Sequence, residues 1–345
     1  MTKGVLAELA ALAGAADGEP HWPEASWQAL RRSGALRWCV PAAYGGEDRT
    51  GPDLLAGYER LAGACLTTCF ILSQRDAAVR RIRDSGNEAL CRELLPPLAR
   101  GDAFATVGLS QLTTSRQHVR PAMTARLTEA ELVLDGAMPW VTGAERADWL
   151  VAGAVLADGR QVLAVVPRGT PGLRVGPPLP LMALEGSLTA EVRCEGAAVA
   201  RRWLLAGPAQ QVLATGRGAG GLETSCLALG LAGAAVDYLT AEAAARPDLR
   251  ATADRLEQAR SSLRADLHRA AGQVCSSEAA AQLRARANAL VLRATQAALT
   301  AAKGAGFLRT HPAQRWARQA MFFLVWSCPR PAVEATLAYL APPCV

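Results

Sequence analysis

A glycine-rich segment is the first stretch of the chain where residue type and spacing could do chemistry. Gly216, Gly218 and Gly221 satisfy the pattern GxGxxG, which in dinucleotide-binding domains brings backbone N–H groups close to a pyrophosphate. That chemistry needs a second parallel strand after the following helix, and the rest of the sequence is helical in pattern. We therefore interpret these glycines as a flexible approach to a helix.

Thiols, imidazoles and a hydroxyl are the next candidates for chemistry. The sequence has nine cysteines without a CxxC pair, and Cys65 and Cys69 lie in an apolar stretch that suits small core residues. The four histidines lack metal-ligand spacing, so we expect no metal site. Ser225 is not in a Gly-x-Ser-x-Gly turn, which leaves a hydrolase triad without a nucleophile. Cysteine usage and the absence of a signal-peptide pattern indicate a reduced, cytoplasmic protein.

Composition limits the class of protein. Of 345 residues, 50% are apolar and 20% charged, which predicts a folded protein with a large core. The 37 basic and 31 acidic residues give a net charge of +6, but the basic residues are scattered, so we expect no nucleic-acid partner. No segment offers the roughly 20 apolar residues that would span a bilayer.

Three regions with different patterns must position any site. Residues 1–103 read as helices, with apolar helical periods in Trp27–Leu36 and Leu54–Leu72. Residues 104–208 hold short alternating runs split by turn residues, which predicts strands. Residues 209–345 are rich in Ala, Leu, Arg and Glu, which predicts long helices. The order helices, strands, helices indicates an α+β fold.

A tryptophan and a threonine close to each other suit an aromatic cofactor. In Pro139-Trp-Val-Thr-Gly-Ala144, Trp140 offers a flat apolar wall and Thr142 a hydroxyl, which together suit a flavin ring. The alternative is a buried core tryptophan beside a turn threonine. The segment resembles W-[IV]-T-[NG] of the acyl-CoA dehydrogenase family of flavoproteins. This resemblance implies that Trp140 packs on the flavin of FAD and that Thr142 bonds the ring edge near N5.

Two earlier segments extend the resemblance. Residues 34–46 end in Pro-Ala-Ala-Tyr-Gly-Gly and are similar to the family's P-x-x-Y-G-G turn. Residues 108–115 occupy the place of the family's flavin loop, T-E-P-x-A-G-S-D, although Gln111 and Leu112 depart from that pattern. The cofactor contacts implied there are Leu109, Ser110, Thr114 and Ser115.

A late segment resembles the part of the family that reaches a neighbouring subunit's flavin. Gly304 and Gly306 match its glycines, and Arg315 and Arg318 its arginines. The resemblance implies a homodimer or homotetramer with Gly304 and Gly306 near a partner's cofactor. The family's R-x-x-F-G turn, which gives an Arg to the flavin pyrophosphate, is represented by Arg246 without the Phe and Gly.

The catalytic base is the residue that decides the reaction. Removing the α-proton of an acyl thioester needs a carboxylate, and most of the family carries it where this chain has Ser327. A minority resembling the isovaleryl- and long-chain-specific members carries it in L-E-R-L-x-L-A-x-G-x-x-G, and Leu222–Gly233 follows that pattern with Glu223 as the acid. Glu223 is the candidate base, although a carboxylate that stabilises a helix N-terminus is the alternative interpretation.

The resemblance implies an N-terminal helical domain, a middle β-barrel-like domain and a C-terminal four-helix bundle. It implies FAD-dependent α,β-dehydrogenation of an acyl thioester on CoA or a carrier protein, and an electron-transfer partner. Two alternatives stay open. One is a flavin-dependent oxygenase or oxidase on the same fold, and the other is a flavin-free relative that acts as an interaction module.

Overall fold

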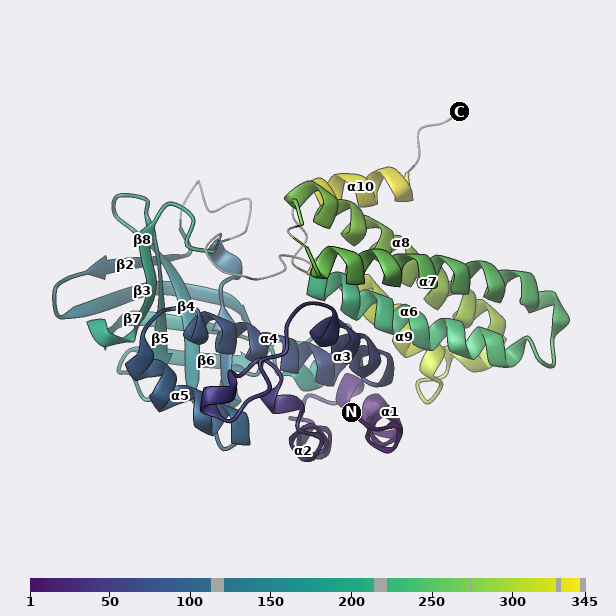
Figure 1. Ribbon diagram of the computed structural model, residues 1–345, viewed down its shortest axis with the longest axis horizontal. Helices are drawn as coiled ribbons and strands as arrows, with labels where there is room; N and C mark the ends of the chain where they lie inside the picture. Colours follow the sequence, from purple (N-terminus) through teal and green to yellow (C-terminus); the bar gives the residue numbers. More distant parts are fainter. Residues whose placement is uncertain (113–120, 214–221, 274, 327–329, 342–345) are drawn as a thin grey trace.

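The computed structural model describes residues 1–112, 121–213, 222–273, 275–326 and 330–341. An N-terminal group of helices, a β-sheet and a C-terminal set of long helices follow one another along the chain (Figure 1). The N-terminal helices lie between the sheet and the C-terminal helices in this view. The predicted α+β arrangement is confirmed.

The N-terminal helices are α1 (Lys3–Gly18), α2 (Glu24–Ser33), α3 (Gly51–Ala64), α4 (Leu66–Arg83) and α5 (Glu88–Arg100). Short 3-10 turns, η1 (Ala35–Arg37) and η2 (Ala42–Tyr44), join α2 to α3. The apolar period over Leu54–Leu72 does not form one helix, because Cys65 has extended backbone angles and separates α3 from α4. The continuous periodicity reflects burial of both helices on their shared side.

Helix α4 is the central element of this region. Of its 18 residues, 13 are buried, including the charged pair Arg75 and Asp76. It packs against α1, α3 and α5, and also against β1, β4 and α6. A helix buried on so many sides links the other two regions, and its C-terminal end reaches the start of α6.

The strands are β1 (Ala105–Gly108), β2 (Met123–Leu127), β3 (Glu131–Val141), β4 (Trp149–Leu156), β5 (Gln161–Pro167), β6 (Leu173–Pro178), β7 (Ala190–Ala200) and β8 (Leu204–Ala209). They form one sheet in the order β6-β7-β3-β2-β4-β5-β8, with β1 pairing in parallel with β4. Strands β4 and β5 are buried over five consecutive residues each, which indicates cover on both faces. Strand β7 alternates between buried and exposed residues, as in a strand with one wet face.

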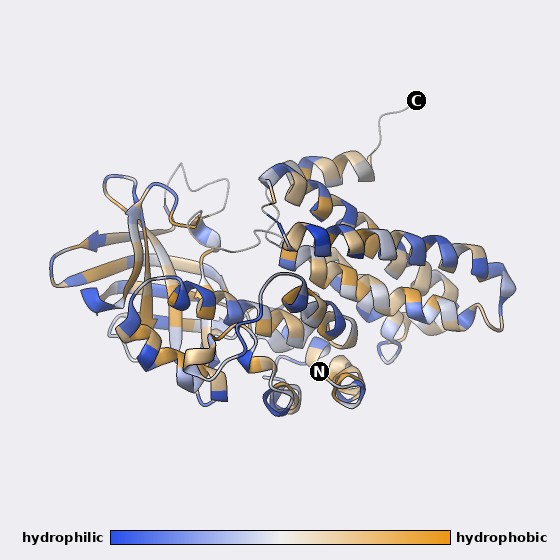
Figure 2. Ribbon diagram, viewed as in Figure 1, coloured by the Kyte–Doolittle hydropathy of each residue, from blue (hydrophilic) through white to orange (hydrophobic). Residues whose placement is uncertain are grey.

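The C-terminal helices are α6 (Leu222–Glu242), α7 (Arg250–Ala271), α8 (Ser277–Ala302), α9 (Pro312–Phe322) and α10 (Arg330–Leu340). Helix α6 packs against α3, α7, α8 and α9, and α10 lies on α8. Figure 2 shows hydrophilic residues recurring along α7, whereas α6 is rich in hydrophobic residues. Helix α6 is thus the core helix around which the bundle is built.

Helix α6 corrects the expectation that no segment is long and apolar enough to span a bilayer. Its 21 residues are long and apolar enough to cross a membrane by length and composition, and 72% of the relevant window is buried inside the protein. Its buried glycine, Gly230, lies so close to α3 that an added Cβ would be 2.3 Å from the Glu59 carbonyl oxygen. The apolar composition therefore matches its packing against neighbouring helices.

Candidate functional site

Trp140 is an exposed tryptophan near the end of β3. Its exposed fraction is 55%, whereas Trp38 is 2% exposed. The interpretation as a buried core tryptophan is therefore wrong. A large apolar ring left open to solvent at the sheet is a surface on which a flat ligand can lie.

Thr142, two residues further, is buried in a chain of hydroxyl groups. Its Oγ1 lies 3.3 Å from Oγ1 of Thr189, which in turn lies 2.9 Å from Oγ of Ser187. The register of β3 on β7, with Val141 opposite Ala190, brings these residues together. No sequence motif pointed to Ser187 or Thr189, because their role depends on strand pairing between segments about 45 residues apart.

The segment that carries Ser187 has an unusual backbone. Leu184 and Leu188 both have positive φ angles, 65° and 45°, which non-glycine residues rarely adopt. At Gly186 between them, an added Cβ would be 2.5 Å from the Ala16 carbonyl oxygen of α1. Strained backbone of this kind is held by its surroundings and is concentrated at functional sites.

The segment after β1 lies beside β3 and β4. The side chain of Gln111 is buried and donates to the carbonyl oxygens of Gly108, at 2.8 Å, and Gly153, at 2.7 Å. These bonds hold the 3-10 turn η3 (Ser110–Leu112) against β4, with Leu109 directly before the turn, and Leu109 and Ser110 are half-buried. Gln111, which departs from the family pattern, thus has a structural role. Thr114 and Ser115 lie outside the described residues.

Glu223 is in the first turn of α6 and forms an ion pair with α4. Arg80 Nη2 donates to Glu223 Oε2 at 2.7 Å, and the side chains are 15% and 23% exposed. Glu223 is therefore half-buried and ion-paired, which differs from a carboxylate that only caps a helix. Ser327, where most of the family has its base, lies outside the described residues, as do Gly216, Gly218 and Gly221.

Arg80 belongs to a larger buried polar cluster. Its Nη1 lies 3.5 Å from the Cys39 thiol, and Tyr58 Oη donates to Asp76 at 2.8 Å. Asp76 also accepts from Arg75 at 2.6 Å. Burial raises the pKa of the Cys39 thiol to about 12. The buried charges thus form two opposite pairs, Arg75 with Asp76 and Arg80 with Glu223.

Gly304 and Gly306 lie at the other end of α6 from Glu223. Arg246, just after α6, donates to the Ala301 carbonyl oxygen at the end of α8 at 2.6 Å, next to η8 (Lys303–Phe307). A 21-residue helix is about 30 Å long, so the two glycines and Glu223 are about that far apart. They do not meet in one site within a single chain. Arg246 binds a helix end in this chain.

The tip formed by η8 and Leu308 is exposed and apolar. An added Cβ at Gly304 would meet nothing within 4 Å, while at Gly306 it would be 2.7 Å from Ala302 Cβ. Phe307 and Leu308 are 84% and 60% exposed. Gly306 is thus required for local packing, and the tip presents two large hydrophobic side chains to its surroundings.

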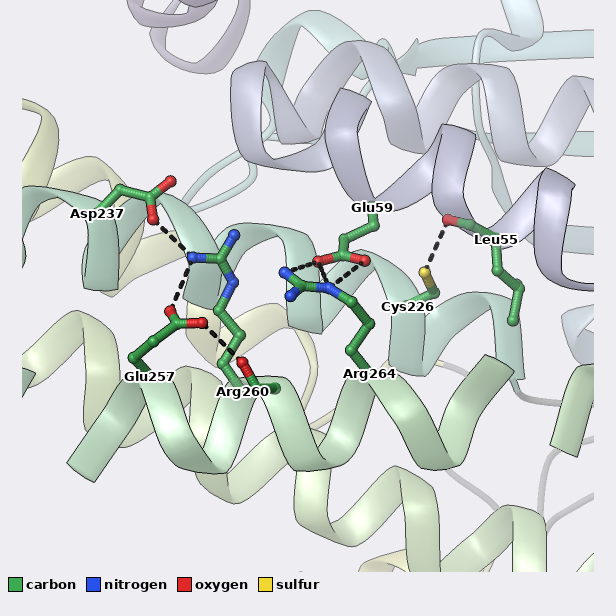
Figure 3. A network of polar contacts seen from close by, with 8 residues as sticks. Leu55, Glu59, Cys226, Asp237, Glu257, Arg260 and Arg264 are labelled. Carbon is green, nitrogen blue, oxygen red and sulfur yellow. Dashed lines mark hydrogen bonds and ion pairs between the residues drawn. The ribbon is translucent and has the colours of Figure 1, made fainter. Parts of the chain in front are cut away.

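A second interhelical ion pair joins α7 to α3 (Figure 3). Arg264 of α7 donates to both carboxylate oxygens of Glu59 of α3, with a closest distance of 2.6 Å. Nearby, Cys226 donates to the Leu55 carbonyl oxygen at 3.0 Å. This pair is similar in length to Arg80–Glu223, but it engages both carboxylate oxygens, whereas Arg80 engages only one oxygen of Glu223. Within the described ranges, no group of three or more His, Cys, Asp or Glu residues could hold a metal ion.

Comparisons with known proteins agree with this architecture. Residues 3–102 match the model of the acyl-CoA dehydrogenase N-terminal domain. The chain is 28% identical over 248 residues to the probable acyl-CoA dehydrogenase YngJ of Bacillus subtilis, covering 69% of this chain and 65% of YngJ. For FadE25 of Mycobacterium tuberculosis the match spans 49% of the relative. The chain is thus matched over about half to two thirds of the length of these relatives.

Solved structures share the fold over nearly the whole chain. Glutaryl-coenzyme A dehydrogenase in complex with glutaryl-CoA superposes with a TM-score of 0.85 at 18% identity, covering 99% of this chain and 96% of that one. The prolyl acyl carrier protein oxidase AnaB superposes with a TM-score of 0.82 at 16% identity, covering 98% of both chains. The domain match, the curated relatives and the solved structures all point to the acyl-CoA dehydrogenase family, to which this chain is similar in sequence over its N-terminal region and in fold over nearly its whole length.

Proposed function

We propose that this protein is an FAD-dependent oxidoreductase that removes two hydrogens from the α and β carbons of an acyl thioester. The observation that supports this most directly is Trp140, a large aromatic ring 55% exposed on the sheet of a chain similar to this family. The residues present suit a flavin: a flat apolar wall, the buried hydroxyl of Thr142, and the half-buried turn at Leu109 and Ser110. FAD bound there supplies the acceptor for the β-hydride.

Glu223 takes the α-proton in this proposal. Its side chain is 23% exposed and forms an ion pair with Arg80, so part of the carboxylate is reachable from outside. Abstraction breaks the α C–H bond, moves the proton to the carboxylate, and leaves the electron pair on the α carbon beside the thioester carbonyl. Thr189 and Ser187 orient the Thr142 hydroxyl, because Thr189 Oγ1 lies within bonding distance of both.

The protein acts as a homo-oligomer in this proposal. Gly304 and Gly306 lie about 30 Å from Glu223 along α6, so contact with a cofactor near Glu223 requires a second copy. The exposed Phe307 and Leu308 suit burial in such an interface. The acyl group of the natural substrate is carried on CoA or on a carrier protein. An electron-transfer flavoprotein is the proposed acceptor of the electrons from the reduced flavin.

The experiment is anaerobic titration of the protein purified with FAD, using butyryl-, isovaleryl- and glutaryl-CoA. We expect one of them to bleach the visible flavin spectrum of the wild type, and Glu223→Gln to bind the flavin but resist bleaching. Flavin that binds and is never bleached by any thioester would contradict dehydrogenation. Oxygen uptake by chemically reduced protein would then favour an oxidase, and a protein that never binds FAD would favour the interaction module.

A further inference from the structure

Glu223 and Arg80 come from segments that are 143 residues apart, yet their side chains meet at 2.7 Å. Among the described residues, this is the only hydrogen bond recorded for the Glu223 side chain, and it engages Oε2 alone. A carboxylate held through one oxygen has a defined direction and keeps its other oxygen for a further partner. A base that must face a substrate carbon needs this arrangement.

Arg80 also contacts a second side chain besides Glu223. Its Nη1 lies 3.5 Å from the Cys39 thiol, whose contact with Tyr58 is 3.8 Å. Burial raises the pKa of both Cys39 and Tyr58, so both groups are neutral at physiological pH. Neutral partners hold the guanidinium in position without cancelling its charge.

The charges around the pair leave Glu223 as the main partner of Arg80. Asp76, the other buried carboxylate nearby, is bonded to Arg75 at 2.6 Å. Burial lowers the pKa of Arg80, but the neighbouring negative charges, Glu223 first among them, outweigh this and raise it well above its ordinary value. Within the described part of the chain, the titratable and charged groups that interact with Glu223 come from four places: Cys39 from the turn after η1, Tyr58 from α3, Arg80 and Arg81 from α4, and Cys226 from α6.

We infer that Arg80 is a positioning residue for the catalytic base: it places a positive charge beside the Glu223 carboxylate and orients it through Oε2, so that Oε1 receives the α-proton of the acyl thioester. The inference rests on the proposed function, because it takes Glu223 as the base. It assigns Arg80 no contact with the substrate. If the ion pair only tied α4 to α6, removing Arg80 would change stability but leave the exchange of the substrate's α-proton unchanged.

The test separates proton abstraction from oxidation. The full-length protein with FAD is incubated with butyryl- or isovaleryl-CoA deuterated at the α carbon, and loss of deuterium to solvent is followed by mass spectrometry from pH 5 to 9. Exchange needs only that the α C–D bond breaks, that the deuteron passes to the base, and that a proton from solvent returns to the α carbon. It therefore reports on the base whether or not the flavin is reduced.

The acidic limb is the low-pH part of the plot of exchange rate against pH, where the rate falls as the base is protonated. For Arg80→Gln we expect this limb to move to higher pH by about 1 unit, because an opposite charge close to the carboxylate is lost. At pH values well below the limb, this corresponds to a roughly tenfold lower exchange rate. Arg81 remains as a second cation, which limits the shift. Arg80→Lys should restore the position of the limb, since it keeps the charge.

Arg264→Gln is the matched control, because it removes a partly buried arginine from an ion pair of similar length that lies away from Glu223. Its acidic limb should coincide with that of the wild type. An unchanged limb in Arg80→Gln, with exchange abolished in Glu223→Gln, would overturn the role of Arg80. The same conclusion follows if Arg80→Gln and Arg264→Gln shift the limb equally.

The remaining outcomes also decide between the two proposals. Loss of α-deuterium without bleaching of the flavin contradicts dehydrogenation. In that case the pH profiles of exchange in the Arg80 variants still test the inference about Arg80. No exchange by the wild type contradicts both. Should Arg80→Gln not fold, a displaced limb in Arg80→Lys would contradict the inference, and the changes in thermal midpoint of Arg80→Lys, Glu223→Gln and the double variant should be non-additive at pH 7.

Discussion

Arg318 of α9 donates to Asp17 of α1 at 2.7 Å, although the two residues are 301 positions apart. Asp17 is 1% exposed and also accepts from the backbone N–H of Leu184 at 2.9 Å and from Gln319 Nε2 at 2.8 Å. One carboxylate therefore joins the first helix, the strained segment beside Thr142 and a C-terminal helix. The arginine that the family resemblance assigned to a flavin-side segment stabilises the assembly of the three regions.

Asp17→Asn should destabilise the protein by about 2–4 kcal/mol, because an amide has one acceptor oxygen for three buried donors and lacks the charge that balances Arg318. Urea unfolding followed by circular dichroism measures this. Arg174→Ala, which removes an exposed pair with Glu195, should cost less than about 1 kcal/mol. Equal losses in the two variants would rule out a joining role for Asp17.

Gly230→Ala should lower the free energy of unfolding by about 2 kcal/mol or more. An added Cβ would lie 2.3 Å from the Glu59 carbonyl oxygen, so α3 and α6 would have to separate. Gly4→Ala in α1 is the control, because its added Cβ meets nothing within 4 Å and alanine favours a helix. A Gly230→Ala variant as stable as the wild type would contradict the close approach of these helices.

Trp140→Ala should destabilise the protein by no more than about 2–3 kcal/mol, because more than half of the residue's surface is exposed and only the remainder is lost from burial. It should weaken FAD binding at least tenfold, measured by fluorescence titration of the apoprotein. Trp38→Ala, at a fully buried ring, should cost about 3–5 kcal/mol instead. Unchanged FAD affinity in Trp140→Ala would remove this residue from the cofactor site.

Stability should fall as the pH rises above 9. Burial raises the pKa of Cys39 to about 12 and of Cys194 to about 11, both above the ordinary value of 9.0. The folded state holds these protons more tightly than the unfolded chain, so their stabilising contribution is complete below pH 9 and is lost as the pH approaches 11 to 12. Urea unfolding at pH 8 and pH 10.5 measures the decline, which should be smaller in Cys39→Ala.

Thiol labelling should distinguish one described cysteine from the others. Cys275 is partly exposed, whereas the remaining described cysteines are buried, namely Cys39, Cys65, Cys69, Cys91, Cys194 and Cys226. Iodoacetamide at pH 8, followed by peptide mass mapping, should modify Cys275 in the native protein and the six buried thiols only after urea is added. Rapid native labelling of Cys69 or Cys226 would contradict the packing of α4 and α6.

Much of the fold follows from local patterns in the sequence. The run Gln161–Val166 predicted a strand that the structure contains, although its burial is continuous over five residues and does not alternate. Cys65 shows the limit. The apolar period continues through it, and only the positions of the surrounding helices decide that the backbone is extended there.

The sequence alone determined the resemblance to the acyl-CoA dehydrogenase family, the order of the three regions and the residue types at Trp140 and Glu223, since these depend on local composition and spacing. Tertiary structure decided which residues meet: Thr189 with Thr142 through strand register, Arg80 with Glu223 through the contact of α4 with α6, and Gly304 at the opposite end of α6. Periodicity within a segment records which face is buried. The partner on that face is selected by packing of the whole chain, which local spacing does not encode.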